Sequence, residues 1–215
     1  MIPLYNEAQV IRGVIEEARR TFPRVVVVDD GSQDGSAAQA EAAGALVVRH
    51  PINLGQGAAL QTGISYVLER TDARYLITFD ADGQHSAADA AAMVRAARDE
   101  DLAFVLGSRF LEGPSPVGWL KRLVLATAAA ATSRTTGMHL TDAHNGLRLL
   151  RRDAAERLNL RQNRMAHASE IIRQLGATGL PWREFPVHIA YTEYSRAKGQ
   201  SLLNSVNILV DLIFS

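Results

Sequence analysis

Short runs of β-branched and other apolar residues alternate with longer amphipathic segments through the first half of the sequence. The clearest run is Arg24–Asp29, where four consecutive valines make both faces apolar, as in a buried parallel strand. The expected strands are Arg24–Asp29, Leu46–Val48, Tyr75–Phe79 and Phe104–Leu106, and the expected helices are Ala8–Arg20, Ser36–Ala43, Gly57–Glu69 and Ala87–Asp99. This alternation predicts an α/β fold with a mostly parallel central sheet and helices on both faces.

The second half of the sequence has a different character after about residue 113. Its polar parts are a loop at Gly113–Pro116 and a turn at Thr141–Gly146. We expect helices at Trp119–Ser133, Arg152–Leu158 and Ala168–Leu175, a strand at Val187–Tyr191, and apolar residues at helical spacing between Leu202 and Ile213. Because no repeat or low-complexity linker divides the chain, residues 1–215 are expected to form a single domain.

Composition and charge exclude several classes of function. Lys plus Arg and Asp plus Glu both number 23, so no binding of nucleic acid is expected. The absence of cysteine excludes disulfides, thiolate metal ligands and cysteine nucleophiles. The first residues lack the pattern of a signal peptide, and no apolar run approaches the roughly 18 residues of a spanning helix. These features predict a cytoplasmic protein that contacts a membrane at most peripherally, from its inner face.

Two carboxylates end an apolar run within Ile77–His85, whose sequence is Ile-Thr-Phe-Asp-Ala-Asp-Gly-Gln-His. If the backbone stays extended, Asp80 and Asp82 point to the same face, because side chains two residues apart do so in a strand. Two converging carboxylates suit Mg²⁺ or Mn²⁺, which bind oxygen ligands and share them with substrate phosphates. Taken alone, the residues also fit an ordinary turn after a strand. Serine at position 86, with Asp89 three residues later, predicts a capping box for the next helix.

Six motifs resemble those of the family-2 glycosyltransferases of GT-A fold, above all the branch similar to dolichol-phosphate mannose synthase. The motifs are Ile2–Glu7, Val27–Ser32, Asn53–Leu60, Phe79–His85, Leu106–Phe110 and Ser195–Ser201, and the likeness runs from residue 2 to about residue 205. The resemblance implies one GT-A (Rossmann-like) domain, in which residues 1–112 bind a nucleoside-diphosphate sugar and residues 113–215 bind the acceptor. The family has several apolar residues before Pro3 where this chain has Met1 and Ile2, so most of the first strand is expected to be missing.

The resemblance also implies which residues bind the donor. These residues are Pro3, Tyr5, Glu7, Asp29, Asp30, Gly57, Asp80 and Arg109. The first three would surround the base and ribose, although a plain helix start capped by Asn6 is the alternative. One of the two consecutive aspartates would accept a hydrogen bond from a base N–H, while the other serves the turn. Glycine at position 57 would let the backbone approach a phosphate or ribose, although such a sequence is more often a turn.

Metal binding and catalysis are assigned in the same way. The implied metal ligands are Asp80, Asp82 and Gln84, the last directly or through water. A neutral His85 imidazole could also bind metal, but a histidine in a loop before a helix is usually an ordinary loop residue. Catalytic roles fall on Asp82, on Arg196 in a loop expected to close over the diphosphate, and on Asp142. We interpret Asp142 as a general base near the acceptor or as a cap, and Glu170 as either a base or a structural carboxylate.

Acceptor binding would depend on basic residues. Arg109 and Arg122 resemble arginines of this branch that grip the acceptor phosphate, and guanidinium groups suit such bidentate contacts. For Arg122 a solvated helix face beside Lys121 is the alternative. The apolar residues 123–131 and the C-terminal stretch would face a membrane that carries polyprenyl phosphate, or would pack on the core or on a homodimer partner.

The sequence therefore predicts an inverting, metal-dependent glycosyltransferase that uses a nucleoside-diphosphate sugar and a polyprenyl phosphate. Three alternatives stay open. The acceptor could be a soluble or saccharide hydroxyl, or the chain could be a non-catalytic nucleotide-sugar-binding module. A nucleotidyltransferase would normally carry a glycine-rich basic loop where this chain has Tyr5-Asn6-Glu7.

Overall fold

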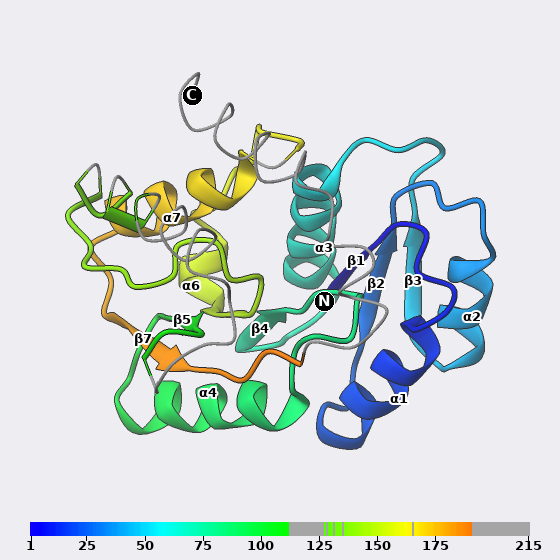
Figure 1. Cartoon of the computed structure of the whole chain (residues 1–215), viewed down its shortest axis with the longest axis horizontal. Coiled ribbons are helices and arrows are strands. Elements are labelled where there is room, and N and C mark those ends of the chain that lie inside the picture. Colours follow the sequence, from blue (N-terminus) through cyan, green and yellow to red (C-terminus); the bar gives the residue numbers. More distant parts are fainter. Residues whose placement is uncertain (112–126, 128, 131, 135, 165, 191–215) are drawn as a thin grey trace.

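The computed structural model describes residues 1–111, 127, 129–130, 132–134, 136–164 and 166–190 (Figure 1). Their strands form two hydrogen-bonded ladders, in the orders β1-β2-β3 and β4-β6-β5-β7. The strands are β1 (Ile2–Leu4), β2 (Val26–Asp29), β3 (Leu46–Arg49), β4 (Tyr75–Thr78), β5 (Phe104–Ser108), β6 (Arg148–Arg151) and β7 (Trp182–Pro186). Met1 joins the ladders, because its amino group donates to Ile77 O at 2.8 Å and its carbonyl accepts from Phe79 N at 3.0 Å.

Most strand pairs are parallel, which confirms the predicted α/β class. Strands β1, β2 and β3 pair in parallel, and so do β5 and β7. Strand β6 is antiparallel to both of its neighbours, β4 and β5. Strand β6, which comes from the second half of the chain, thus lies between β4 and β5, which come from the first half.

Helices cover both faces of the sheet, as predicted (Figure 1). One layer holds α1 (Ile11–Thr21), α2 (Ser36–Ala42) and α4 (Ala87–Asp99), and the other holds α3 (Gln56–Arg70), α6 (Arg152–Ala155) and α7 (His167–Ala177). Two buried apolar clusters result. In β2 the alternation is visible, since Val27 packs with Ile11 and Ile15 of α1, whereas Val26 packs with Leu60 and Ile64 of α3. Strand residues one apart face opposite sides of the sheet, which explains why this run is apolar throughout.

The first strand is short but present. Its three residues are buried and pair with Val27, Val28 and Asp29 of β2. The strand that was expected to be mostly missing is thus short, but Met1 and β1 together still bridge the sheet between β2 and β4.

The structure departs from the strand predictions at three places. The strand expected at Val187–Tyr191 lies earlier, at Trp182–Pro186, where Arg183 and Glu184 interrupt the apolar pattern. No strand was expected at Arg148–Arg151, because arginines at both ends leave only two apolar residues between them. The run Leu46–Val48 was expected to be buried on both faces, but β3 has a neighbour on one side among the described residues, and Leu46 is 45% exposed.

Helix α1 starts later than predicted, and the N-terminal cap of α4 differs in part from prediction. Helix α1 begins at Ile11 rather than at residue 8, since residues 5–10 form the loop that leaves β1. Helix α4 is capped by Ser86, whose Oγ accepts from Ala88 N and Asp89 N at 3.2 and 3.3 Å. The predicted capping box is incomplete, however, because Asp89 Oδ2 accepts from His188 N at 2.7 Å instead.

Several predicted features lie outside the described residues. They are the Gly113–Pro116 loop, most of the Trp119–Ser133 helix, Arg122, the Ser195–Ser201 loop with Arg196, and the stretch from Leu202 to Ile213. Within the part of the chain that the structure describes, no helix has the length and apolar character needed to cross a membrane.

Candidate active site

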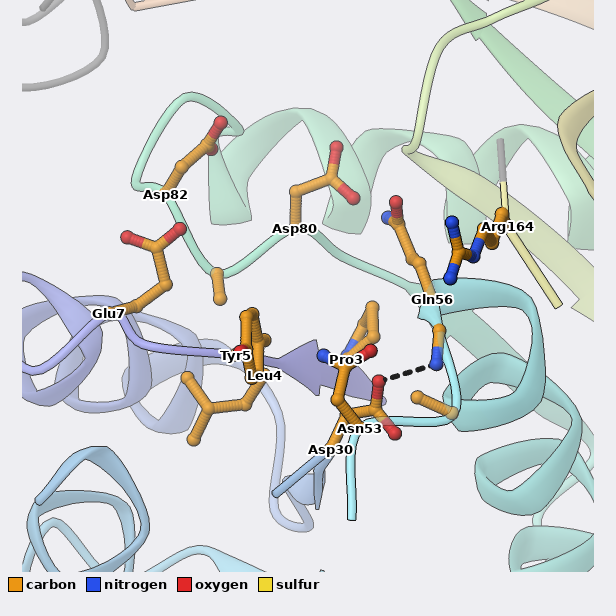
Figure 2. Close-up of a pocket in the computed structure, with 13 residues that line it drawn as sticks. Pro3, Leu4, Tyr5, Glu7, Asp30, Asn53, Gln56, Asp80, Asp82 and Arg164 are labelled. Atoms are coloured by element: carbon orange, nitrogen blue, oxygen red, sulfur yellow. Dashed lines mark hydrogen bonds between the residues drawn. The ribbon is translucent and has the colours of Figure 1, made fainter. Parts of the chain in front are cut away.

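A cavity of about 500 Å³ lies at the carboxyl ends of β1, β2 and β4, the edge where α/β sheets bind ligands (Figure 2). It is lined by Pro3, Leu4, Tyr5, Glu7, Asp30, Asn53, Gly55, Gln56, Ala59, Asp80, Ala81, Asp82 and Arg164. Six predicted site residues (Pro3, Tyr5, Glu7, Asp30, Asp80 and Asp82) share this one cavity. Residues far apart in the sequence meet there because the strands that carry them lie side by side.

Both carboxylates of the acidic motif face the cavity, but not for the reason expected. Strand β4 ends at Thr78, and residues 81–82 form a turn rather than an extended strand. Asp80 is held by His85, whose Nε2 lies 2.9 Å from Asp80 Oδ2. It also fills the space left by Gly146, since a Cβ at that glycine would stand 2.1 Å from Asp80 Oδ2. The turn therefore presents both carboxylates, and His85 is a partner of Asp80 rather than a plain loop residue.

The two carboxyl groups differ in their electrostatic surroundings. Burial would raise the pKa of Asp80, but the charges of His85 and Arg148 and the hydrogen bond from His85 outweigh burial and lower that pKa. Burial, followed by the negative charge of Asp80, raises the pKa of Asp82, and Glu7 adds to the effect. A cation placed between these acids would relieve their mutual repulsion.

The cavity suits a metal that shares its ligands with a substrate. Among the described residues, no group of three or more histidine, aspartate or glutamate side chains is arranged to enclose a metal ion. The neighbouring Asp80 and Asp82 offer carboxylate oxygens, the ligand type that Mg²⁺ and Mn²⁺ prefer, and would leave further positions to water or phosphate. The amide N–H of Gln84 donates to Asp82 Oδ1 at 3.0 Å, so this residue orients the carboxylate, and its role as a ligand stays a prediction.

The loop after β1 is fastened to the loop after β2. Asn6, at φ 54°, donates its N–H to Ser32 Oγ at 3.0 Å, and Glu7 N donates to Ser36 Oγ at 2.8 Å. Serine at position 36 thus supports the first loop as the opening residue of α2, and Gly35 takes the cap position. Tyr5, half exposed at the mouth of the cavity, and the buried Glu7 are held in place by these contacts.

Asp29 and Asp30 have different structural roles. Asp29 Oδ1 accepts from Ser32 N at 3.2 Å, which is ordinary turn chemistry, and the residue does not line the cavity. Asp30 lines the cavity, while its carboxylate accepts from Leu54 N at 2.9 Å and Gly55 N at 2.7 Å and contacts His50 Nδ1 at 2.7 Å. Asp30 therefore shapes the wall formed by residues 53–56, and base binding by either aspartate stays a prediction.

Gly57 lies behind the cavity wall rather than on it. Its N–H donates to Asn163 O at 2.8 Å, and a Cβ there would stand 2.0 Å from Gln162 O and 2.8 Å from His167 Cβ. The absence of a side chain thus allows a backbone-to-backbone approach within the protein. Donor binding by Gly57 stays a prediction, and its neighbours Gly55 and Gln56 line the cavity instead.

Arg109 is held by a buried carboxylate. Its Nε lies 2.6 Å from Asp142 Oδ2, and the Asp142 side chain has no exposed surface. The turn that carries Asp142 is in turn held by Glu184 of β7, which accepts from Thr141 N at 2.8 Å and Asp142 N at 3.0 Å. Neither Arg109 nor Asp142 lines the cavity described above, so the roles predicted for them stay predictions.

Two buried bases lie beneath the acidic motif and were missed from the sequence. Arg148 is 3% exposed, and burial lowers its pKa, while Asp80 and Asp142 oppose that shift. His167 is equally buried, and its Nδ1 donates to Arg164 O at 2.6 Å. Burial lowers the pKa of His167 from 6.5 to about 4. Neither burial could be predicted from the sequence, because a lone basic residue in an apolar segment is usually exposed.

Glu170 has a structural role. It is buried in α7, and its carboxylate accepts from Arg161 N at 3.0 Å and Gln162 N at 2.9 Å. These bonds fix the segment that leads to α7 and, with it, Arg164 on the cavity wall. Arg164 is a cavity residue that we did not expect, since it stands out neither in composition nor in spacing. Asn53 and Gln56 lie in the motif Asn53–Leu60 but were not singled out as site residues.

Known proteins resemble this chain along its whole length. A family model described as "Glycosyl transferase family 2" matches residues 1–158. An uncharacterized protein of Methanocaldococcus jannaschii is 33% identical, covering 99% of this chain and 89% of that protein. The UDP-N-acetylglucosamine–dolichyl-phosphate N-acetylglucosaminyltransferase of Methanococcus voltae is 28% identical, covering 99% and 93%. The polyprenol monophosphomannose synthase of Mycolicibacterium smegmatis is 31% identical, covering 74% and 63%.

Solved structures share the fold. Glucosyl-3-phosphoglycerate synthase of Mycobacterium tuberculosis, crystallised with Mn²⁺ and UDP-glucose, superposes with a TM-score of 0.69 at 19% identity. The superposition covers 99% of this chain and 76% of that one. The sequence relatives agree with the branch that the motifs indicated, and the solved structures agree with the predicted GT-A fold.

Proposed function

Since the chain belongs to glycosyl transferase family 2, we propose that it is an inverting, metal-dependent glycosyltransferase that moves a sugar from a nucleoside-diphosphate sugar to a polyprenyl phosphate. The observation that carries this proposal is the shared cavity, where Asp80 and Asp82 stand together with Tyr5 and Glu7 (Figure 2). A volume of about 500 Å³ is in the range of pockets that hold ligands of nucleotide size.

Donor binding follows from the chemistry of the cavity wall. The exposed ring of Tyr5 offers a face for stacking a base, and Glu7 offers a carboxylate that accepts from hydroxyl groups. Asp80 and Asp82 would hold Mg²⁺ or Mn²⁺, which would neutralise the diphosphate when bound. The lowered pKa of Asp80 keeps this carboxylate ionised at neutral pH, as a metal ligand requires.

Transfer would be a single displacement. The acceptor oxygen forms a bond to the anomeric carbon while the bond from that carbon to the diphosphate oxygen breaks, and the electron pair leaves with the nucleoside diphosphate. The fixed carboxylates and the loops that they orient would hold the donor so that the acceptor can reach its anomeric carbon from the side opposite the diphosphate. Stabilising the leaving group by preorganised charge is the main contribution expected from such a site.

The acceptor is proposed to be a polyprenyl phosphate at a membrane surface. The relatives from M. voltae and M. smegmatis are named for dolichyl-phosphate and polyprenol substrates. An acceptor phosphate is already anionic and needs no general base, which fits an Asp142 that is buried and bonded to Arg109. In this proposal Asp142 positions Arg109 for the phosphate. Glucosyl-3-phosphoglycerate synthase is the precedent for the alternative, a soluble acceptor.

The test is a transfer assay with defined donors and acceptors. The protein is incubated with UDP-sugars or GDP-sugars and Mn²⁺, and with either dolichyl phosphate or 3-phosphoglycerate, and the products are separated into lipid and aqueous phases. We expect a lipid-linked sugar with inverted anomeric configuration, and no product in EDTA. Product in the aqueous phase alone would favour the soluble acceptor, and full activity in EDTA would reject the metal.

A matched pair of variants locates the metal. Asp82→Asn should abolish transfer without lowering the melting temperature, because the amide keeps the shape and removes a charge that Asp80 repels. Asp99→Asn, at the exposed end of α4, is the control and should leave transfer unchanged.

A further inference from the structure

The cavity is strongly acidic on one side. Figure 2 shows Glu7 and Asp82 at that side, Asp80 between them and Gln56, and Arg164 at the other side, beside Gln56. Asp30 is the fourth carboxylate of the lining. Among the described residues that line the cavity, Arg164 carries the one basic side chain. Resting on the proposed function, we infer that Arg164 binds the diphosphate of the nucleotide donor from the side opposite the metal-binding carboxylates.

The backbone under Arg164 is firmly placed. Its carbonyl accepts from His167 N at 3.0 Å and from His167 Nδ1 at 2.6 Å. The preceding carbonyl, that of Asn163, accepts from Gly57 N at 2.8 Å. Residues 163–164 are therefore tied to the first turn of α3 and the first turn of α7, two elements that the buried core holds in place. The backbone that carries Arg164 is therefore held in a fixed position beside the cavity.

Glycine at position 55 makes room for this arrangement. A Cβ there would stand 2.2 Å from Asn163 O and 3.5 Å from Arg164 Cγ. Gly55 has φ 103°, a conformation that L side chains rarely adopt. The close approach brings the Arg164 side chain to the wall formed by Gly55 and Gln56, where it faces the cavity.

The Arg164 guanidinium is available to a ligand. It has no hydrogen-bond or ion-pair partner among the described residues, whereas Arg109, Arg151 and Arg152 each bind a carboxylate. A guanidinium offers paired N–H donors whose spacing matches two phosphate oxygens. A diphosphate entering this cavity meets four carboxylates, those of Glu7, Asp30, Asp80 and Asp82, so a metal ion and an arginine together would balance its charge better than the metal alone.

The experiment compares ligands that differ in their phosphate number. Calorimetric titration in Mn²⁺ uses UDP, GDP and their monophosphates and nucleosides, with wild type, Arg164→Gln and Arg164→Lys. Arg161→Gln is the control, because Arg161 is also exposed and lies three residues away, but it does not line this cavity.

We expect Arg164→Gln to weaken binding of the preferred nucleoside diphosphate by about tenfold or more, as loss of a charged hydrogen-bond pair would. Binding of the corresponding nucleoside should stay unchanged, Arg164→Lys should fall between, and Arg161→Gln should match wild type. If Arg164→Gln binds the diphosphate normally, the inference is overturned but the proposed function stands. The same holds if the variant loses affinity equally for the nucleoside and the diphosphate. If wild type binds neither UDP nor GDP, the proposed function falls with it.

Discussion

Lowering the pH should destabilise this protein in a way that can be traced to His167. The side chain is 3% exposed, and burial lowers its pKa from 6.5 to about 4. The hydrogen bond from Nδ1 to Arg164 O opposes burial but does not offset it. The folded protein therefore keeps this imidazole neutral over a range in which the unfolded chain protonates it.

The sign and size of the effect follow from proton linkage. Between pH 6.5 and about 4 the unfolded state binds a proton that the folded state does not, so the free energy of unfolding falls as the pH drops through this window. At about 1.4 kcal/mol per pKa unit, lowering the pKa of His167 from 6.5 to about 4 corresponds to about 3 kcal/mol. This loss is a large fraction of the roughly 5–15 kcal/mol of a typical domain. Below about pH 4 the contribution of His167 levels off.

The assay is urea unfolding followed by circular dichroism, in steps from about pH 7 to about pH 4. Carboxylates titrate in the same range, so the informative quantity is the difference between wild type and His167→Asn. Asparagine keeps a donor near the Nδ1 position and does not titrate. Between about pH 7 and about pH 4, the free energy of unfolding of His167→Asn should therefore fall by about 3 kcal/mol less than that of wild type. His188→Asn is the control, because the His188 side chain is 82% exposed. Parallel pH profiles for wild type and His167→Asn would refute the reasoning.

Three further outcomes are expected. Gly146→Ala should lower metal-dependent transfer by at least about tenfold, because its Cβ would stand 2.1 Å from Asp80 Oδ2; unchanged activity would mean that the carboxylate tolerates displacement. Glu184→Gln should raise KM for the acceptor more than for the donor, since Glu184 holds the turn that aims Arg109, and equal effects on both would argue for general loosening. Deletion after Ser201 should reduce co-sedimentation with anionic liposomes, whereas an undiminished pellet would place membrane binding elsewhere.

The fold was largely predictable because local patterns and tertiary packing agree in most elements. Helix α4 begins and ends where its amphipathic pattern does, at Ala87 and Asp99. Strand β6 was hidden because burial of Arg148 depends on carboxylates brought near by β4 and by the 141–146 turn, which no local pattern reveals. Strand β7 was misplaced for a similar reason, since Trp182 stacks on Phe104 of the neighbouring strand β5, with ring centroids 5.8 Å apart, a contact that no local pattern reveals.

The candidate site was predictable where a motif carries its own ligand chemistry. The acidic motif was recognisable from Asp80 and Asp82, and the loop after β1 from Tyr5 and Glu7. In each case the side chains that suit a ligand lie two residues apart in the sequence. Arg164 was not, since its position depends on the hydrogen bonds of Asn163 and His167 and on the missing side chain of Gly55. Distant contacts of this kind become visible when the chain is folded.

The position of β6 has a consequence for how the protein is made. Strands β4 and β5 are complete once residue 108 has been synthesised, but the strand that separates them ends at residue 151. At the roughly 5–20 residues per second of translation, those further 43 residues take on the order of several seconds. During that interval the emerging chain carries two strands whose facing edges have no partner, and exposed edges of this kind readily pair with other chains. Ribosome-bound nascent chains that stop between residues 108 and 148 should therefore depend on chaperones far more than chains that extend past residue 151.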